Sequence, residues 1–262
     1  MPIVAVAMHL ALSQGLCPGV RYERWRTQAA TVHVISVAAP ATGRVRPVVA
    51  PQGRASLLAL AGQGVAAING GYFDPRTSAP VSWVLADGRT LSDPRQNRSL
   101  MTNPALQPYL PVIDKRTEWQ SLQGPTGWRW QFASHGAPAP GGWALQHALQ
   151  AGPQLLPDDG LVKEAFLRPG QDPLNAHGHA ARSGLGLTVQ GDLVLAMCPG
   201  GQSLATFRQT LQGLGCVSAM ALDGGSSSQM AWRDGKGWHV VGPGGPNGRR
   251  AAILSALVVG GS

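Results

Sequence analysis

The sequence predicts an α+β fold in which a mixed β-sheet is flanked by a few helices. Glycine (35) and proline (21) make up about one in five of the 262 residues, a composition of strands and turns rather than of helix bundles. Segments that alternate like β-strands outnumber helical ones, and hairpins occur beside strand–helix–strand units. The length and the 44% share of hydrophobic residues suit a single packed domain. Residues 92–180 are predicted to form an irregular, loop-rich insertion in it.

The first half of the chain is predicted to consist mainly of strands. Alternation and β-branched residues mark five of them, at residues 31–38, 44–50, 65–68, 82–86 and 128–133. We expect the first two to be neighbours, and we expect the fourth to end at the Asp87-Gly88 turn. A short helix is expected at residues 55–61, closed by glycine. Residues 143–150 are predicted to form one or two helical turns, and residues 92–127 show only weak signals.

The second half of the chain is easier to interpret. Residues 183–189 and 192–198 are predicted to form a hairpin around Gln190-Gly191. Ser203 is expected to cap a helix whose apolar face carries Leu204, Phe207, Leu211 and Leu214. Apolar strands are expected at residues 217–222, 229–232 and 252–259.

The N-terminus has two interpretations. Residues 3–16 are mostly apolar and have the length of a signal h-region, but they lack a basic flank and a clean cleavage site. Residues 1–20 are therefore interpreted as the remnant of an export signal before a domain of residues 21–262, or else as an ordinary first strand. The first interpretation predicts a secreted or periplasmic protein. No apolar run reaches the roughly 18 residues of a membrane span, so no integral membrane segment is expected.

The cysteines bear on the same question. If Cys17 is lost with a signal, Cys198 and Cys216 remain, with one predicted helix between them. In an exported protein they could form a disulfide, and the alternative is a pair of buried thiols.

The charge of the chain is strongly positive. Lysine and arginine total 21 against 13 acidic residues, which gives a net charge of +8, and nearly all of the positive charge is arginine. The basic residues form no run of five, and aromatic residues do not alternate with them, so a nucleic-acid partner is not expected. An anionic substrate or an acidic glycan polymer suits this charge.

Asn69-Gly70-Gly71-Tyr72-Phe73-Asp74 is the first candidate site segment. It follows a predicted buried strand, where glycines allow a ligand to approach the backbone. Asn69 can both donate and accept hydrogen bonds to a hydroxyl, and Tyr72 or Phe73 could stack on a sugar. The alternative is a simple turn.

Asp223-Gly224-Gly225-Ser226-Ser227 is the second candidate segment, again at the end of an apolar strand. Its backbone and hydroxyl donors could bind an anion. Asp223 could act as a nucleophile, as a base or as a stabiliser of an oxocarbenium ion. The alternative is a capped turn with a solvated carboxylate. The segment is not a G-x-S-x-G elbow, so it does not favour a serine esterase.

Three further positions complete the candidate set. Gln150 and Gly152 lie in one loop, and Arg182 precedes a strand from which its guanidinium could bind phosphate through two hydrogen bonds. His177 and His179 resemble a metal-binding pair, but no clear third ligand accompanies them. No metal or cofactor is therefore assigned.

Together, these segments resemble the phosphodiester glycosidase family over residues 65–259. The matching pieces, in order, are INGGYFD (68–74), QAGPQLLPDDG (150–160), ARSGLG (181–186), SLATFRQTLQGLG (203–215), ALDGGSSSQM (221–230) and GPNGRRAAILSALVV (245–259). The resemblance implies a mixed α/β catalytic domain that hydrolyses a sugar-1-phosphodiester, in exported or cell-wall glycan metabolism. The chain departs from the family in three places. It has GGSSS after Asp223 where the family commonly has a third glycine, and ARSGLG where an Arg-Thr-Ala-like run is usual. It also has Ser255 where asparagine is common.

The resulting hypothesis is a phosphodiester glycosidase whose candidate catalytic residues are Asp223, Asn69 and Arg182. Asp223 would face the anomeric carbon, Asn69 would orient a hydroxyl or N-acetyl group, and Arg182 would bind phosphate. The candidate substrate-binding residues are Gly70, Gly71, Tyr72, Asp74, Gln150, Gly152, Gly224, Gly225, Ser226 and Ser227. Two alternatives remain: a non-catalytic module that binds a glycan or cell-wall polymer, and a metal-dependent hydrolase that uses Asp223 with His177 and His179.

Overall fold

The computed structural model describes residues 7–27, 30–157, 164, 172, 174–245 and 249–261. Within them the strands form three sheets, and every pairing is antiparallel. The predicted mixed sheet is therefore corrected to antiparallel sheets, although the combination of many strands with few helices is confirmed. No helix in this part of the chain is both long and apolar enough to cross a membrane.

The seven-stranded sheet contains, in spatial order, β1 (His9–Cys17), β2 (Val20–Arg26), β3 (Thr31–Val37), β13 (Leu193–Gln202), β12 (Ala180–Thr188), β14 (Cys216–Ala221) and β11 (Gln154–Leu156). A second sheet, here the β5 sheet, contains β16 (Gly237–Val241), β15 (Met230–Asp234), β5 (Ala66–Asn69), β17 (Ser255–Val259) and β4 (Val45–Val49). The third, the β8 sheet, contains β7 (Arg89–Ser92), β6 (Val84–Ala86), β10 (Ala144–Gln150), β8 (Thr117–Gly124) and β9 (Gly127–Ser134).

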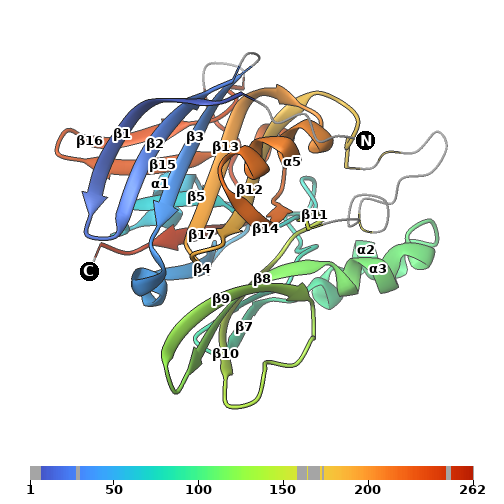
Figure 1. Cartoon of the computed structure of the whole chain (residues 1–262). Coiled ribbons are helices and arrows are strands. Elements are labelled where there is room, and N and C mark those ends of the chain that lie inside the picture. The colour runs from blue at the N-terminus through green and yellow to red at the C-terminus, as the bar shows by residue number, and fades with distance from the viewer. Residues whose placement is uncertain are drawn as a thin grey trace.

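The first two sheets pack face to face, with a helix on each outer side. The core between them includes Tyr22 of β2, whose ring stacks on Trp232 of β15 at 3.8 Å between centroids. On the outer face of the seven-stranded sheet, Phe207 and Leu211 of α5 (Leu204–Gly213) are buried. On the outer face of the β5 sheet lies α1 (Leu57–Ala61). Figure 1 shows α5 in front of β12 and β13.

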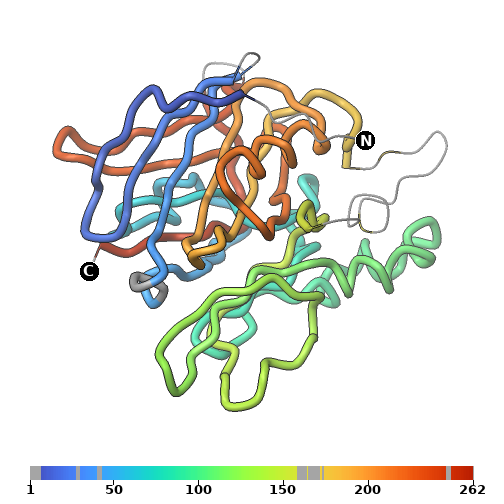
Figure 2. Tube along the Cα trace, viewed as in Figure 1, coloured from blue at the N-terminus to red at the C-terminus, as the bar shows by residue number. Residues whose placement is uncertain are grey.

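The β8 sheet forms a separate lobe below this sandwich, as the chain trace in Figure 2 shows in green. Beside it lie the two short helices α2 (Arg98–Thr102) and α3 (Leu110–Lys115). The 3₁₀ turns among the described residues are η1 (Ala39–Arg44), η2 (Pro94–Gln96), η3 (Gln107–Tyr109) and η4 (Gly225–Ser227). The predicted irregular insertion is therefore wrong for residues 92–156, because most of them pair or pack in this lobe.

Local signals placed several elements correctly. Ser56 caps α1 and Ser203 caps α5, each through a side-chain oxygen that accepts a backbone N–H three residues on. Asp87 (φ 51°) and Gly88 (φ 69°) form the tight turn between β6 and β7. The predicted hairpin of β12 and β13 is also confirmed.

Two strand predictions need correction. Residues 144–150 form β10 rather than helical turns, because β6 and β8 pair with them on both sides. Residues 45–49 form the predicted strand β4, but it pairs with β17 and not with β3. Both errors concern partners that lie far away in the sequence, which local alternation does not encode.

The N-terminal segment takes part in the fold. Residues 9–17 form β1, which pairs with β2 along its length, as expected if the segment is an ordinary first strand. Residues 1–6 lie outside the described residues, and the export signal and the domain limits remain predictions.

Of the two alternatives for Cys198 and Cys216, the structure has the pair of buried thiols and not the disulfide. Cys198 of β13 lies opposite Arg182, and Cys216 of β14 lies opposite Thr188, on the two sides of β12. The two partners are six residues apart along β12, or about 20 Å, which is far beyond the reach of a disulfide. All three cysteines are free thiols, and burial raises the pKa of Cys198 to about 11 and that of Cys216 to about 12.

We therefore expect Cys198 and Cys216 to be unreactive in the native protein and available once it unfolds. Maleimide labelling followed by mass spectrometry should leave both unmodified under native conditions at pH 7, because the thiolate is the reactive form. In denaturant without a reducing agent, all three cysteines should be labelled. A denatured, unreduced sample that takes up only one label would contradict this assignment.

Candidate active site

The candidate site forms where β14 of the seven-stranded sheet and β5 of the β5 sheet end side by side. The backbone N–H of Asp223 donates to the carbonyl of Gly70 at 3.1 Å. The Asn69 side chain donates from Nδ2 to the Asp223 carbonyl at 2.8 Å and accepts the Gln229 N–H at 2.9 Å. Asn69 is only 1% exposed. In this geometry its amide holds the Asp223 loop in place.

The Asp223 carboxyl is half-buried at the mouth of β14. Desolvation raises its pKa from 3.8 to about 7, against hydrogen bonds from the Ser227 side chain and the Gly224 N–H that lower it. At neutral pH the group therefore exchanges between its protonated and ionised forms, which suits a group that acts on a reacting centre.

The glycines of the two loops play different structural roles. A Cβ on Gly70 would lie 2.4 Å from Ser255 Oγ, and one on Gly71 would lie 2.4 Å from the Gln150 carbonyl. These two glycines allow close packing of backbone segments. Gly225 has φ 61° and opens η4, where Ser226 is exposed and Ser227 is buried.

Tyr72 lies among the charged side chains of the site. Its hydroxyl donates to the Gly152 carbonyl at 2.8 Å, and the guanidinium of Arg116 lies 5.1 Å from its ring centroid. Burial is the main cause that raises the pKa of Tyr72, and Asp223 and Glu164 raise it further. The cations of Arg116 and Arg182 act in the opposite direction on the same pKa. The phenol of Tyr72 is therefore influenced electrostatically by two carboxyls and two guanidinium groups.

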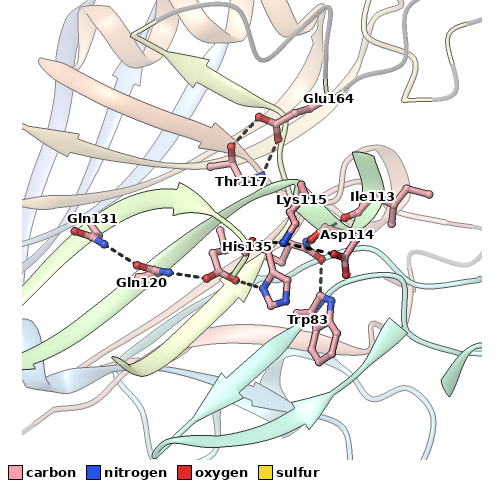
Figure 3. A network of polar contacts seen from close by, with 11 residues as sticks. Trp83, Ile113, Asp114, Lys115, Thr117, Gln120, Gln131, His135 and Glu164 are labelled. Atoms are coloured by element: carbon pink, nitrogen blue, oxygen red, sulfur yellow. Dashed lines mark hydrogen bonds and ion pairs between the residues drawn. The ribbon is translucent and has the colours of Figure 1, made fainter. Parts of the chain in front are cut away.

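Glu164 and Arg116 were missed by the sequence analysis. Glu164 accepts from the Thr117 N–H and from the Thr117 hydroxyl, both at 2.8 Å, as Figure 3 shows at the start of β8. A Cβ on Gly152 (φ 77°) would lie 2.5 Å from Glu164 Oε2, so this position requires glycine. Arg116 is 4% exposed. Neither residue lies in a strand or helix signal that pointed to a site, so only the tertiary structure identifies them.

Arg182 is buried on β12 and makes several bonds to the backbone. Its Nε donates to Gln202 O (2.8 Å), its Nη1 to Leu174 O (3.4 Å), and its Nη2 to Gly178 O (2.8 Å) and Asn175 O. Among the described residues, four of its five N–H groups are thus engaged, and at most one is left for a ligand. A two-point bond to phosphate, as the sequence suggested, is not available in this arrangement. A Cβ on Gly224 would lie 3.5 Å from Nη1, which places the guanidinium beside the Asp223 loop.

The two remaining candidates act on the loops around the site. Gln150 accepts the Trp83 N–H at 3.1 Å and donates to the carbonyls of Ile113 and Asp114, both at 3.0 Å. Asp74 accepts the Arg76 N–H at 2.8 Å, and this bond lowers the pKa of its carboxyl. Gln150 therefore joins β10 to α3, and Asp74 caps its own turn.

A second polar cluster lies on the β8 sheet. Glu118 Oε2 is 2.7 Å from His135 Nδ1, and Gln120 donates to the other carboxylate oxygen of Glu118 at 2.7 Å. Because side chains alternate along a strand, Glu118 faces away from its neighbour Thr117, which holds Glu164. Figure 3 shows the two groups on opposite sides of β8.

The side chains of Arg116, Arg182, Glu164 and Asp223 around Tyr72 are called the charged group here. A cavity of about 520 Å³ adjoins it. Tyr72 and Arg116 belong to its wall, together with Asp172 and a set of mostly apolar side chains. His177 and His179 are exposed. The described residues contain no group of three or more His, Cys, Asp or Glu side chains that could hold a metal ion.

Comparison with known proteins finds one matching family model and several similar structures. The model of the phosphodiester glycosidases matches residues 62–259. The catalytic domain of zebrafish N-acetylglucosamine-1-phosphodiester α-N-acetylglucosaminidase, auto-inhibited by its pro-peptide, is similar in structure. Its TM-score is 0.68 at 16% identity, over 99% of this chain and 84% of that one.

Two bacterial structures are also similar. A Synechocystis protein has a TM-score of 0.64 at 16% identity over 96% of this chain, which spans 63% of that protein's length. A Burkholderia pseudomallei protein has a TM-score of 0.60 at 12% identity, over 99% of this chain and 98% of that one. No curated protein matches the sequence. At these identities the structural similarities establish the fold.

Proposed function

The chain belongs to the phosphodiester glycosidase family, and we propose that it hydrolyses the bond between a sugar's anomeric carbon and a phosphodiester oxygen. The observation that carries this proposal is the Asp223 carboxyl, with a pKa of about 7, at the mouth of a buried strand. The buried guanidinium groups of Arg116 and Arg182 lie in the same charged group around Tyr72. A carboxylate close to cations suits a sugar-1-phosphodiester, because the phosphate is anionic and the neighbouring anomeric carbon becomes positively charged during the reaction.

The reaction breaks the bond from C1 to the phosphate oxygen. The oxygen of water becomes the hydroxyl on C1, the phosphate monoester leaves with the bonding electrons, and one proton of the water is released. Because the second pKa of a phosphate monoester is about 6, this leaving group is a weak base and needs little help from a general acid. The site must instead stabilise an oxocarbenium-like carbon and the phosphate charge.

The residues divide between these two tasks. Asp223 in its ionised form faces the anomeric carbon and stabilises or attacks it. The N–H groups of Gly225 and Ser226, the one remaining N–H of Arg182 and the guanidinium of Arg116 stabilise the phosphate. Asn69 positions Asp223 through the bond to its carbonyl. Glu164 fixes the strand start at Thr117 and adds a second carboxyl beside Tyr72.

The setting is proposed to be exported or cell-wall glycan metabolism, with the protein secreted or periplasmic. This location is proposed from the sequence of residues 3–16, although residues 9–16 of that segment belong to β1, and the net charge of +8 suits anionic glycan substrates.

Incubation with a panel of sugar-1-phosphodiesters and ordinary aryl glycosides tests the reaction. We expect reducing sugar and a phosphate monoester to be released from phosphodiesters only, with equal rates in the presence and absence of a chelator. Sugar binding without any product would support a non-catalytic glycan-binding module instead. Activity that is lost in chelator and restored by a divalent metal would support a metal-dependent hydrolase.

A further inference from the structure

The cavity beside the charged group is mainly apolar. Its volume of about 520 Å³ lies in the range of small-molecule sites. The apolar side chains on its wall come from the loop after β5, from the α2–α3 region and from the segment before β12, and they are Phe73, Val81, Leu100, Leu106, Ile113 and Leu174. Of these, Leu106 and Val81 are partly exposed, so their surfaces are available to a ligand. Such a wall suits a hydrocarbon group better than a second sugar, because sugar hydroxyls buried there would lack partners.

A second cavity borders two of the same side chains. A neighbouring cavity of about 380 Å³ shares Leu100 and Ile113 with it and is also lined by Leu110 and Pro111. Arg95, Gln107 and Asp114 also line this second cavity, so its wall is partly polar.

Two charged side chains line the cavity, those of Arg116 and Asp172. Arg116 lines it and lies 5.1 Å from the Tyr72 ring centroid. Tyr72 forms part of the same wall, and its phenol interacts electrostatically with Asp223 and Arg182. A ligand in the cavity would therefore place its polar end next to the group that we assign to the phosphate, with its apolar part pointing toward α3.

We propose that the substrate is a glycosyl-1-phosphodiester whose second alcohol carries an alkyl or isoprenoid-like chain, and that this chain occupies the cavity. The inference rests on the proposed function and specifies its substrate class. The sugar lies toward Asp223, the phosphate lies toward Arg116, and the hydrocarbon lies between Phe73 and the α2–α3 helices. The phosphate monoester product keeps the chain and remains bound by the same surface.

Product binding tests this assignment without requiring turnover. Isothermal titration calorimetry with methyl, butyl, hexyl and octyl phosphate, each below its micelle-forming concentration, measures the contribution of the chain. Burial of a methylene should tighten binding about fourfold, so octyl phosphate should bind roughly two orders of magnitude more tightly than butyl phosphate. Equal affinities for methyl and octyl phosphate would overturn the proposal.

A cavity-filling variant locates the binding. Leu106→Trp should remove the dependence on chain length and leave methyl phosphate affinity unchanged. Leu91→Trp, at an exposed position of β7 outside the cavity wall, is the matched control and should behave like the unmodified protein. Val81→Phe is the second filling variant if the tryptophan impairs folding, which the melting temperature reports. Unchanged octyl phosphate affinity in a folded filling variant would place the binding elsewhere and overturn the proposal.

Turnover measurements separate the proposed glycosidase activity from the proposed alkyl substrate class. With one sugar-1-phosphate esterified to methanol or to octanol, kcat/KM should be higher for the octyl ester, mainly through KM. Chain-dependent binding without hydrolysis of any phosphodiester would refute the glycosidase and support the cavity assignment. Hydrolysis with identical kcat/KM for both esters would support the glycosidase and overturn the alkyl substrate class.

Discussion

Replacing Asp223 with asparagine should lower kcat for a sugar-1-phosphodiester at least about a hundredfold, because the neutral amide cannot stabilise the developing positive charge or attack it. The substitution keeps the shape of the side chain and leaves the Asn69 bond to the residue 223 carbonyl intact. Turnover per folded molecule, with the folded fraction taken from circular dichroism, is the measurement. Turnover close to that of the unmodified protein would remove Asp223 from the catalytic step.

The pH dependence of kcat/KM in the unmodified protein should report the ionisation of the same carboxyl. If the ionised carboxyl is the active form, kcat/KM rises as pH increases through about 7 and then levels off. The Asp223→Asn variant should lose this inflection. A rate that falls as pH rises through 7 would instead assign the protonated Asp223 as a general acid.

The free energy of unfolding should fall as pH rises, whereas kcat/KM should rise. The pKa of Asp223 is raised in the folded state from 3.8 to about 7, so ionisation of the carboxyl costs folding free energy. This cost is absent below about pH 4, grows between the two pKa values and is complete above about 7. Asp223→Asn removes it, and the variant should gain at least about 1 kcal/mol relative to the unmodified protein between pH 4 and pH 8. Asp87→Asn, at an exposed turn position that accepts asparagine, is the matched control and should show neither effect.

Arg182→Lys should destabilise the protein by about 2–4 kcal/mol. A lysine ammonium has three N–H groups at one point, whereas the guanidinium reaches four carbonyls, at residues 174, 175, 178 and 202. At least one buried carbonyl would therefore lose its partner. Urea unfolding gives the change in free energy, and kcat/KM per folded molecule should also fall about tenfold or more, because the guanidinium borders the Asp223 loop at Gly224.

A comparison with an exposed arginine separates this positioning role from general charge. The Arg76 side chain is 89% exposed, and Arg76→Lys should leave both quantities unchanged. If Arg182 served only to bind phosphate, Arg182→Lys would raise KM with an unfolding free energy within about 0.5 kcal/mol of the unmodified value. That result would contradict the role that we assign from its backbone bonds.

Several parts of the fold and site were predictable because their signals are local. Ser56 and Ser203 cap helices, and Asp87-Gly88 forms a turn, through contacts within three residues. The position of Asp223 just after a buried strand was also predictable from the apolar residues before it, whereas its catalytic role stays a prediction. These positions needed no knowledge of which strands pair.

The sequence by itself determined the predominance of strands, the capped helices, and the two strand-end loops that carry Asn69 and Asp223. Only the tertiary structure decided that residues 144–150 form a strand. Alanine, leucine and glutamine in that segment favour a helix locally, and pairing with β8 and β6 overrides this preference. It also decided that Arg182 binds backbone carbonyls and that Arg116 and Glu164 join the site. The physical reason is shared: burial, pKa and hydrogen-bond partners depend on residues brought together from separate sheets, and local spacing along the chain does not encode those neighbours.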